Sequence, residues 1–214
     1  MEEYIKYLSG LIHERDSLKL VKKEAKKFQS SHSAEECYQT GLKLYQLDNF
    51  QIQEVGVFLM GYAAHQKPEA LDFLRNTVST HESWKVQETL AMAFDIHCKQ
   101  IGYEVSLPLI WEWLEDERAN VRRAVSEGLR VWISRPYFKD HPKIAIEFLA
   151  AHKDDAREYV RKSIGNALKD ISKKYPDLVQ KELETWDTSF RPVLQVFKLA
   201  RKWLDKNPLS GGAK

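Results

Sequence analysis

The chain contains few of the features that define several common protein classes. Its 214 residues include only 2 cysteines, too few and too isolated for a disulfide framework or a zinc cage. No apolar run approaches the roughly 20 residues that cross a bilayer, and residues 1–16 carry charged side chains where a secretory signal would be apolar. We therefore expect a cytoplasmic protein with reduced thiols and no membrane partner.

Proline and glycine are also scarce, with seven and nine copies, and most prolines stand at or just before an expected helix start. Apolar residues recur at steps of three and four, and no stretch reads convincingly as a β-strand. The pattern predicts about a dozen helices. Breaks between them are expected at Lys67-Pro68, Gly102, Arg135-Pro136, His141-Pro142, Tyr175-Pro176 and Asn207-Pro208.

Four short segments repeat a β-branched residue followed by two polar residues. They begin at Ile52, Val86, Val121 and Val160, at intervals of 34, 35 and 39 residues. Periods of this length are typical of antiparallel helix pairs that stack into a solenoid. We predict an all-α fold, a right-handed α-α superhelix of HEAT-like helical repeats. Residues 1–207 are expected to form a single domain, and residues 208–214 a flexible tail.

Positive charge is concentrated in one part of the chain. Residues 118–174 contain 14 Lys or Arg and 7 Asp or Glu, a net charge of +7, whereas the whole chain carries +2. Five further lysines lie at helical spacing within residues 19–27. Segregated positive charge indicates an anionic polymer, most simply the phosphates of a nucleic acid. For the N-terminal lysines alone, a merely solvated helix face is an equal alternative.

The two polar residues of each repeat are expected to differ in environment. Residues 116–124 and 155–163 resemble the HEAT signature, in which an acidic residue five places ahead of Val-Arg orders the turn into the second helix. Arg122 and Arg161 would then lie between layers and hold neighbouring turns, with DNA contact as their alternative role. Arg123 and Lys162 lie roughly 100° further around the helix, so we expect them to face the concave groove.

Glu54 and Glu88 occupy the position equivalent to Arg123 and Lys162. The repeat register therefore predicts that four inner helices present Glu, Glu, Arg and Lys to one groove.

A candidate ligand stripe runs along the helix that carries Glu88. Trp84 lies four residues before Glu88 and Asp95 lies seven residues after it, on one helical face. An indole beside carboxylates suits a cationic planar ligand, because the ring quadrupole and the negative charge both attract it. The alternative is a core tryptophan next to a solvated glutamate.

Three segments carry a resemblance to a known family. They are residues 83–88 (Ser-Trp-Lys-Val-Gln-Glu), 121–128 (Val-Arg-Arg-Ala-Val-Ser-Glu-Gly) and 159–168 (Tyr-Val-Arg-Lys-Ser-Ile-Gly-Asn-Ala-Leu). Over roughly residues 69–186 the chain resembles the DNA alkylation repair family, the HEAT-like glycosylases typified by AlkC and AlkD, and is more similar to the AlkC branch. Members of this family hold duplex DNA on a concave helical surface and excise purines alkylated at N3 or N7.

The resemblance implies roles for individual residues. Trp84 matches the groove tryptophan that packs beside the damaged nucleotide, and Glu88 stands where the AlkD branch has its catalytic aspartate. Arg123 matches the arginine that contacts the DNA backbone near the lesion. Where AlkD-type enzymes have a second groove tryptophan, this chain has Asn166.

The expected activity is that of a monofunctional DNA glycosylase, acting as a monomer on duplex DNA with alkylated bases. Glu88 is expected to be the main catalytic carboxylate, assisted by Glu54 or Asp95, with Arg123 and Lys162 on phosphates. No cofactor is expected, and no metal, because the histidines lack metal-binding spacing. Two alternatives remain open: a non-catalytic HEAT-like protein that binds DNA structures, and a protein-interaction scaffold.

Overall fold

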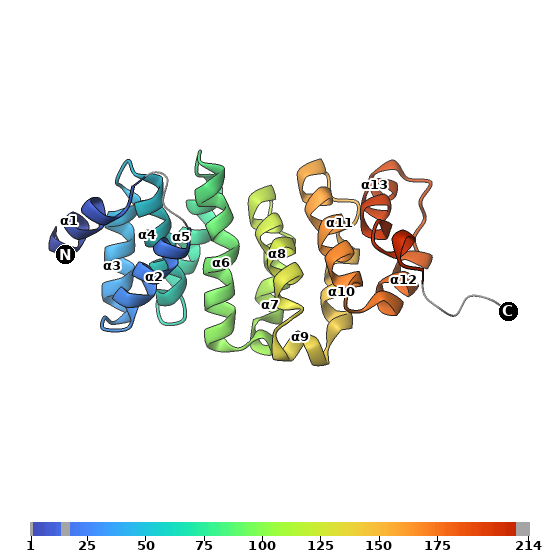
Figure 1. Ribbon diagram of the computed structural model, residues 1–214, viewed down its shortest axis with the longest axis horizontal. Helices are drawn as coiled ribbons and strands as arrows, with labels where there is room; N and C mark the ends of the chain where they lie inside the picture. Colours follow the sequence, from blue (N-terminus) through green and yellow to red (C-terminus); the bar gives the residue numbers. More distant parts are fainter. Residues whose placement is uncertain (1, 14–17, 209–214) are drawn as a thin grey trace. The chain divides into compact units, whose positions relative to one another are not determined.

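A computed structural model describes residues 2–13 and 18–208, and within these ranges every regular element is helical (Figure 1). The all-α fold predicted from the repeat period is therefore confirmed. The chain divides into two compact units, residues 1–106 and 107–214. A single domain over residues 1–207 stays a prediction, and the predicted tail lies outside the described residues except for Pro208.

The first unit is built around α4, which packs against α2, α3, α5 and α6. The helix α7 (Tyr103–Leu114) spans the boundary between the units. The helices that lie wholly within the first unit are α1 (Glu2–Leu11), α2 (Leu18–Gln29), α3 (Ala34–Tyr45), α4 (Phe50–Ala63), α5 (Pro68–Asn76), the short 3-10 helix η1 (Val78–Thr80) and α6 (Trp84–Ile101).

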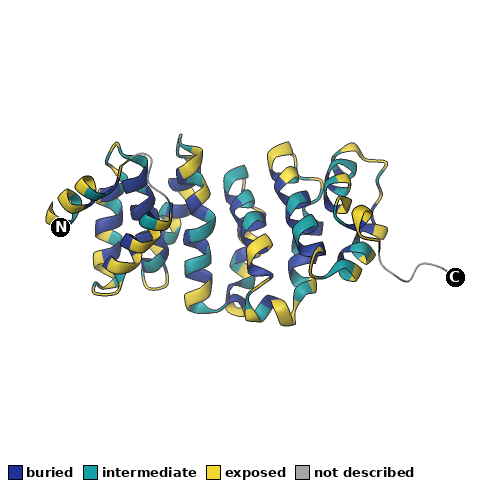
Figure 2. Ribbon diagram, viewed as in Figure 1, coloured by how far each residue is buried: buried dark blue, intermediate teal, exposed yellow. Residues whose placement is uncertain are grey.

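The helix α4 is apolar on nearly all sides and is buried accordingly (Figure 2). Asn49 caps its first turn by accepting hydrogen bonds from the backbone N–H groups of Gln51 and Ile52. At Gly61 an added Cβ would lie 2.7 Å from the carbonyl oxygen of Ala93, so α4 and α6 approach more closely than a side chain would allow. This close approach positions the two helices that carry Glu54 and Glu88.

The second unit is built around α11, which packs against α8, α10, α12 and α13. Buried hydroxyls of Ser126 and Ser163 lie 2.7 Å apart and join α8 to α11. The helices of this unit are α8 (Ala119–Trp132), α9 (Pro136–Asp140), α10 (Pro142–Ala151), α11 (Glu158–Ser172), α12 (Pro176–Glu184), α13 (Arg191–Arg201) and the short η2 (Leu204–Lys206).

Helix boundaries follow the turn residues of the sequence. Four helices begin at a proline, as predicted, because the first helical N–H needs no partner. Gly102 ends α6 with a φ of 95°, a left-handed conformation that favours glycine. Pro108 departs from this pattern, because it lies inside α7, where it removes one backbone donor.

Candidate nucleic-acid interface

The first polar residue of all four repeat segments makes the same contact. Each side chain donates a hydrogen bond to the backbone carbonyl six residues earlier, at the turn that leads into its own helix. The bonds are Gln53 Nε2 to Leu47 O at 2.7 Å, Gln87 Nε2 to His81 O at 2.5 Å, Arg122 Nη1 to Asp116 O at 2.7 Å and Arg161 Nη1 to Asp155 O at 2.5 Å. This position therefore closes the turn of each helix pair.

The two arginines at this position also reach the next layer of helices. Arg122 forms a two-pronged ion pair with Asp155, with Nε to Oδ2 at 2.6 Å and Nη2 to Oδ1 at 2.9 Å. Both side chains are largely buried, which makes the pair expensive to break. Arg161 donates from Nε to Gln195 at 2.8 Å. These contacts favour the interlayer role for both arginines, and their contact with DNA stays a prediction.

The acidic residue five places ahead of each Val-Arg pair orders the turn, as predicted. Asp116 accepts a hydrogen bond from the backbone N–H of Arg118 at 2.8 Å. Asp155 accepts the equivalent bond from Arg157, also at 2.8 Å. Each aspartate thus forms an Asx turn just before its helix begins.

The second polar residue of each repeat has no such uniform role. In the first unit, Glu54 on α4 is 5% exposed, whereas Glu88 on α6 is exposed. The pKa of Glu54 is raised from 4.5 to about 7, mainly because the side chain is buried; the positive charge of Lys85 opposes this rise, and the negative charge of Glu88 adds to it. The structure therefore brings Glu54, Glu88 and Lys85 into one electrostatic cluster.

Lys85 is a member of this cluster that the sequence did not single out. Its ammonium nitrogen lies 4.4 Å from the ring centroid of Phe50, the first residue of α4. The contact holds the cation beside Glu54, where it partly offsets the cost of burying a carboxylate. The sequence offered one signal for Lys85, its position in the repeat: it immediately precedes Val86, as Tyr159 immediately precedes Val160.

Trp84 is the first residue of α6 and is 60% exposed, so it is not a core tryptophan. Because α6 is unbroken from Trp84 to Ile101, Glu88 lies on the same face, about 6 Å further along the helix axis. Asp95 shares that face but lies about 10 Å beyond Glu88. Its carboxylate accepts a hydrogen bond from the hydroxyl of Tyr103, a partner that the sequence did not indicate.

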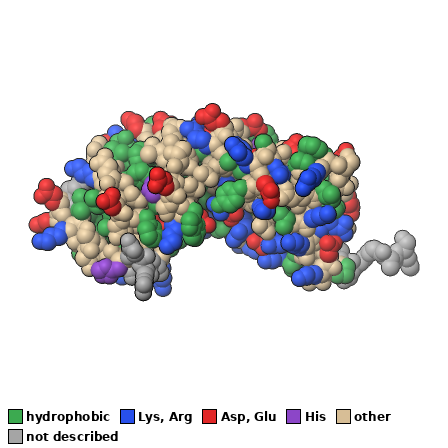
Figure 3. Space-filling view, turned by 90° about the horizontal axis from the view of Figure 1, so that it is seen from above, with side chains coloured by type: hydrophobic (Ala, Val, Ile, Leu, Met, Phe, Trp, Pro, Cys, Tyr) green, Lys and Arg blue, Asp and Glu red, His purple; other side chains and the backbone are tan. Residues whose placement is uncertain are grey.

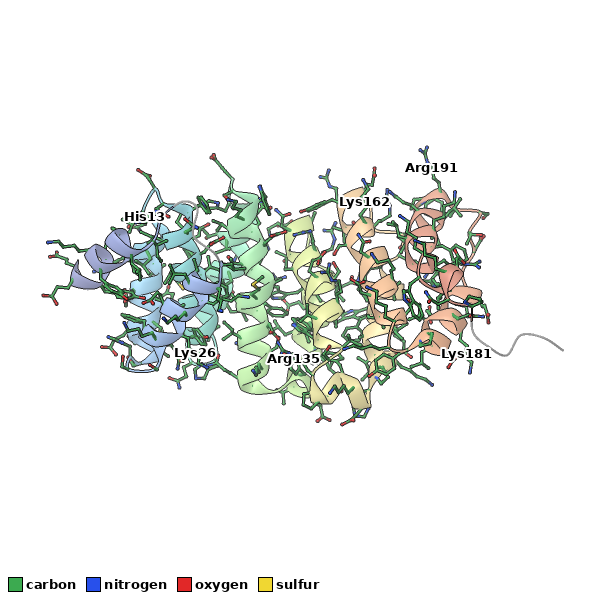
Figure 4. All side chains as sticks on the ribbon, viewed as in Figure 1. His13, Lys26, Arg135, Lys162, Lys181 and Arg191 are labelled. Carbon is green, nitrogen blue, oxygen red and sulfur yellow. The ribbon has the colours of Figure 1, made fainter. Side chains whose placement is uncertain are left out.

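In the second unit, the guanidinium carbon of Arg123 lies 4.6 Å from the ring centroid of Tyr159. Tyr159 is 50% exposed, so the pair forms a cationic and aromatic surface across α8 and α11. Lys162 is exposed at the start of α11 and pairs with Glu158 at 2.7 Å (Figure 4). Such an exposed pair contributes little to stability. Lysine and arginine side chains gather over this unit in Figure 3.

The predicted groove residues thus fall into two separate sets. Glu54, Glu88 and Trp84 lie in the first unit, and Arg123 and Lys162 lie in the second. One groove shared by all of them stays a prediction. Within the described residues, no group of three or more His, Cys, Asp or Glu side chains could hold a metal ion, and no helix is long and apolar enough to span a bilayer.

A family model and two solved structures match most of the chain. The chain matches the family model for DNA alkylation repair enzymes over residues 17–204. The crystal structure of AlkD2 from Streptococcus mutans is 44% identical, with a TM-score of 0.88, over 95% of this chain and 99% of that one. The structure of smu.31 from Streptococcus mutans UA159 is 45% identical, with a TM-score of 0.85, over 94% and 98%.

A curated relative matches over a shorter stretch. The uncharacterized protein YhaZ of Bacillus subtilis (strain 168) is 38% identical over 90 residues, or 40% of this chain. The match spans only 25% of the length of YhaZ. These similarities do not distinguish the AlkC branch from the AlkD branch, so the AlkC-like assignment stays a prediction. Because the family model covers most of its length, this chain belongs to the DNA alkylation repair enzyme family.

Proposed function

We propose that the protein is a monofunctional DNA glycosylase that releases purines carrying a positive charge after alkylation at N3 or N7. The observation that carries this proposal is the cluster of the first unit, where Glu54 and Glu88 interact beside the exposed indole of Trp84. Two carboxylates and an aromatic face are suited to a cationic base and to the sugar cation formed when that base leaves.

The chemistry needs little from the protein beyond this charge. A cationic alkylpurine leaves as a neutral base when the glycosidic bond breaks, so no general acid is required. Positive charge then develops on the deoxyribose, and a carboxylate about 4 Å away stabilises it by about 4 kcal/mol at an effective dielectric near 20, about a thousandfold in rate. Because Glu88 is exposed in the free protein, this gain requires the bound DNA to displace water.

Hydrolysis is completed by water, which attacks C1′ and transfers a proton to a nearby base. Glu54 is suited to accept it, because a base with a pKa near the working pH is most effective and the pKa of Glu54 is about 7. In this arrangement Glu88 stabilises the sugar cation. Asp95 is a weaker candidate for that role, because it lies about two turns beyond Glu88 along α6. In this proposal Arg123 and Lys162 bind phosphates, and the protein acts as a cytoplasmic monomer without metal or cofactor.

The test is release of free base from methylated duplex DNA by the purified protein. Wild type is expected to release 3-methyladenine or 7-methylguanine, and Glu88→Gln to release neither. Glu69→Gln is the matched control, since it makes the same change at an exposed residue of α5 in the same unit. Equal release by Glu88→Gln and wild type would move the stabilisation of the sugar cation from Glu88 to Glu54 or Asp95. No release by any of the proteins would refute the proposal.

A second candidate, a DNA-structure binder without catalysis, is favoured by one observation. Asn166 stands in place of a second groove tryptophan, and its side chain accepts a hydrogen bond from Lys169 of its own helix at 3.2 Å. The neighbouring Gly165 is explained by packing, since an added Cβ would lie 2.6 Å from Cβ of Leu199. Salt-dependent binding to duplex or branched DNA without base release would support this candidate.

A further inference from the structure

We propose that α2 is a second nucleic-acid contact of the protein, which binds the phosphate backbone through a lysine stripe on its exposed face. The stripe is defined by Lys19, Lys22, Lys23, Lys26 and Lys27, all of them exposed. This inference rests on the proposed function only in its choice of DNA as the anion. It assigns a role to a surface in the first unit, apart from the basic residues 118–174 of the second.

The stripe is continuous and carries charge of one sign. At 100° per residue, the five lysines fall within an arc of about 140° on the helix surface. The one acidic residue of α2, Glu24, is only 3% exposed and accepts a hydrogen bond from the hydroxyl of Tyr7 at 3.2 Å. The exposed face of α2 therefore presents cations alone.

This arrangement works against the stability of the isolated helix. Lysines three or four residues apart repel one another, as in Lys19 with Lys23 and Lys22 with Lys26. Lys19 also stands in the first turn, where the helix dipole disfavours positive charge. Surfaces that serve solubility usually intersperse charges of both signs, and this stripe does not. An anion that binds along the stripe would relieve this repulsion.

Contacts with the rest of the first unit hold part of the stripe in place. The ammonium nitrogen of Lys27 lies 5.0 Å from the ring centroid of Tyr7 and donates to its hydroxyl at 3.4 Å. That of Lys22 lies 5.9 Å from the ring centroid of Phe58. Within residues 2–13 and 18–208, none of the five lysines forms an ion pair with a carboxylate. Lys26 projects from the edge of the unit in Figure 4.

The geometry favours a nucleic acid over a membrane. An amphipathic helix binds a bilayer by inserting its apolar face, but in α2 the apolar residues Val21, Ala25 and Phe28 are buried within the unit and Leu18 and Leu20 are partly buried, and the helix packs mainly against α4. The exposed residues of α2 are its five lysines, so this face acts mainly through electrostatics. From Lys19 to Lys27 the helix rises about 12 Å, which matches three to four steps of about 3.4 Å along one DNA strand.

The test compares duplex binding at several salt concentrations. The variant K19Q/K23Q/K26Q removes three charges from the stripe and retains good helix formers. The control K43Q/K99Q/K202Q removes three exposed charges at separate places, on α3, on α6 and at the C-cap of α13. We expect the stripe variant to bind undamaged duplex on the order of 100-fold more weakly at 0.1 M salt, with a log–log salt slope shallower by two to three units, about 0.9 per lost contact. The control should change both quantities far less, and K19R/K23R/K26R should bind like wild type.

The outcomes separate this inference from the proposed glycosylase activity. A steep salt slope in wild type that persists in the stripe variant overturns the stripe alone. Loss of binding in the stripe variant, without any base release by wild type, supports the stripe and refutes the glycosylase. Wild-type binding to vesicles of anionic phospholipid but not to DNA overturns the stripe as a nucleic-acid contact. Thermal melting checks the fold, because removing repulsion should leave the melting temperature of K19Q/K23Q/K26Q equal or higher.

Discussion

The substitution Glu54→Gln should stabilise the protein in a manner that depends on pH. Glu54 is buried on α4, and burial raises its pKa from an ordinary 4.5 to about 7. Folding therefore favours the protonated form. The stability contributed by this preference is present below pH 4.5 and is lost as the pH rises through about 7. Glutamine has nearly the same shape and no charge, so the variant does not lose stability in this way.

The magnitude follows from the interval between the two pKa values. At 1.36 kcal/mol per pKa unit, ionised Glu54 costs the folded state at most about 3 kcal/mol at pH 8 and less than about 1 kcal/mol at pH 5. The amide of glutamine also changes hydrogen bonding, but that contribution is independent of pH. The difference between the two pH values therefore isolates the charge, at about 2 kcal/mol.

Urea unfolding followed by circular dichroism at pH 5 and pH 8 measures this difference. Other titrating groups cancel, because each pH compares the variant with wild type. Glu69→Gln, at an exposed position on α5, should show no difference between the two conditions. If the advantage of Glu54→Gln over wild type is the same at both pH values within about 0.5 kcal/mol, Glu54 is ionised without penalty and the argument from burial is wrong.

Three further predictions address the rest of the site. Arg122→Ala should lower the free energy of unfolding by about 3 to 5 kcal/mol, because it leaves Asp155 buried without its partner. Arg123→Ala should change the free energy of unfolding by less than about 1 kcal/mol and should weaken binding to DNA of any sequence. If urea unfolding and DNA titration give the reverse result, the two arginines have exchanged roles. Glu88→Gln should bind duplex DNA as tightly as wild type or more tightly, since it removes a negative charge from the proposed DNA surface, and a weaker affinity in a fluorescence anisotropy titration would contradict that placement. Base release should be confined to cationic lesions, and efficient release of hypoxanthine would reveal a general acid. If Glu54 is the base, the rate of release should rise between pH 6 and 8, and a rate that is flat over this range would exclude Glu54.

Part of the fold and of the site could be predicted from the sequence because it depends on local interactions. The spacing of Ile52, Val86, Val121 and Val160 indicated helix pairs, and Asp155 could be assigned to a turn from its place ahead of Val160. Local chain geometry also separates the first polar residue of each repeat from the second, since a step of about 100° around a helix does not require knowledge of distant contacts.

Only the tertiary structure decided which of these side chains are buried and what they contact. Glu54 and Glu88 occupy equivalent places in the sequence, yet one is buried and the other exposed, because α4 is enclosed by four other helices and α6 presents its first turns to solvent. The same holds for Lys85 over Phe50, a contact between helices more than 30 residues apart. Burial and long-range contacts set pKa values and charge clusters, and they depend on packing between helices that no single segment encodes.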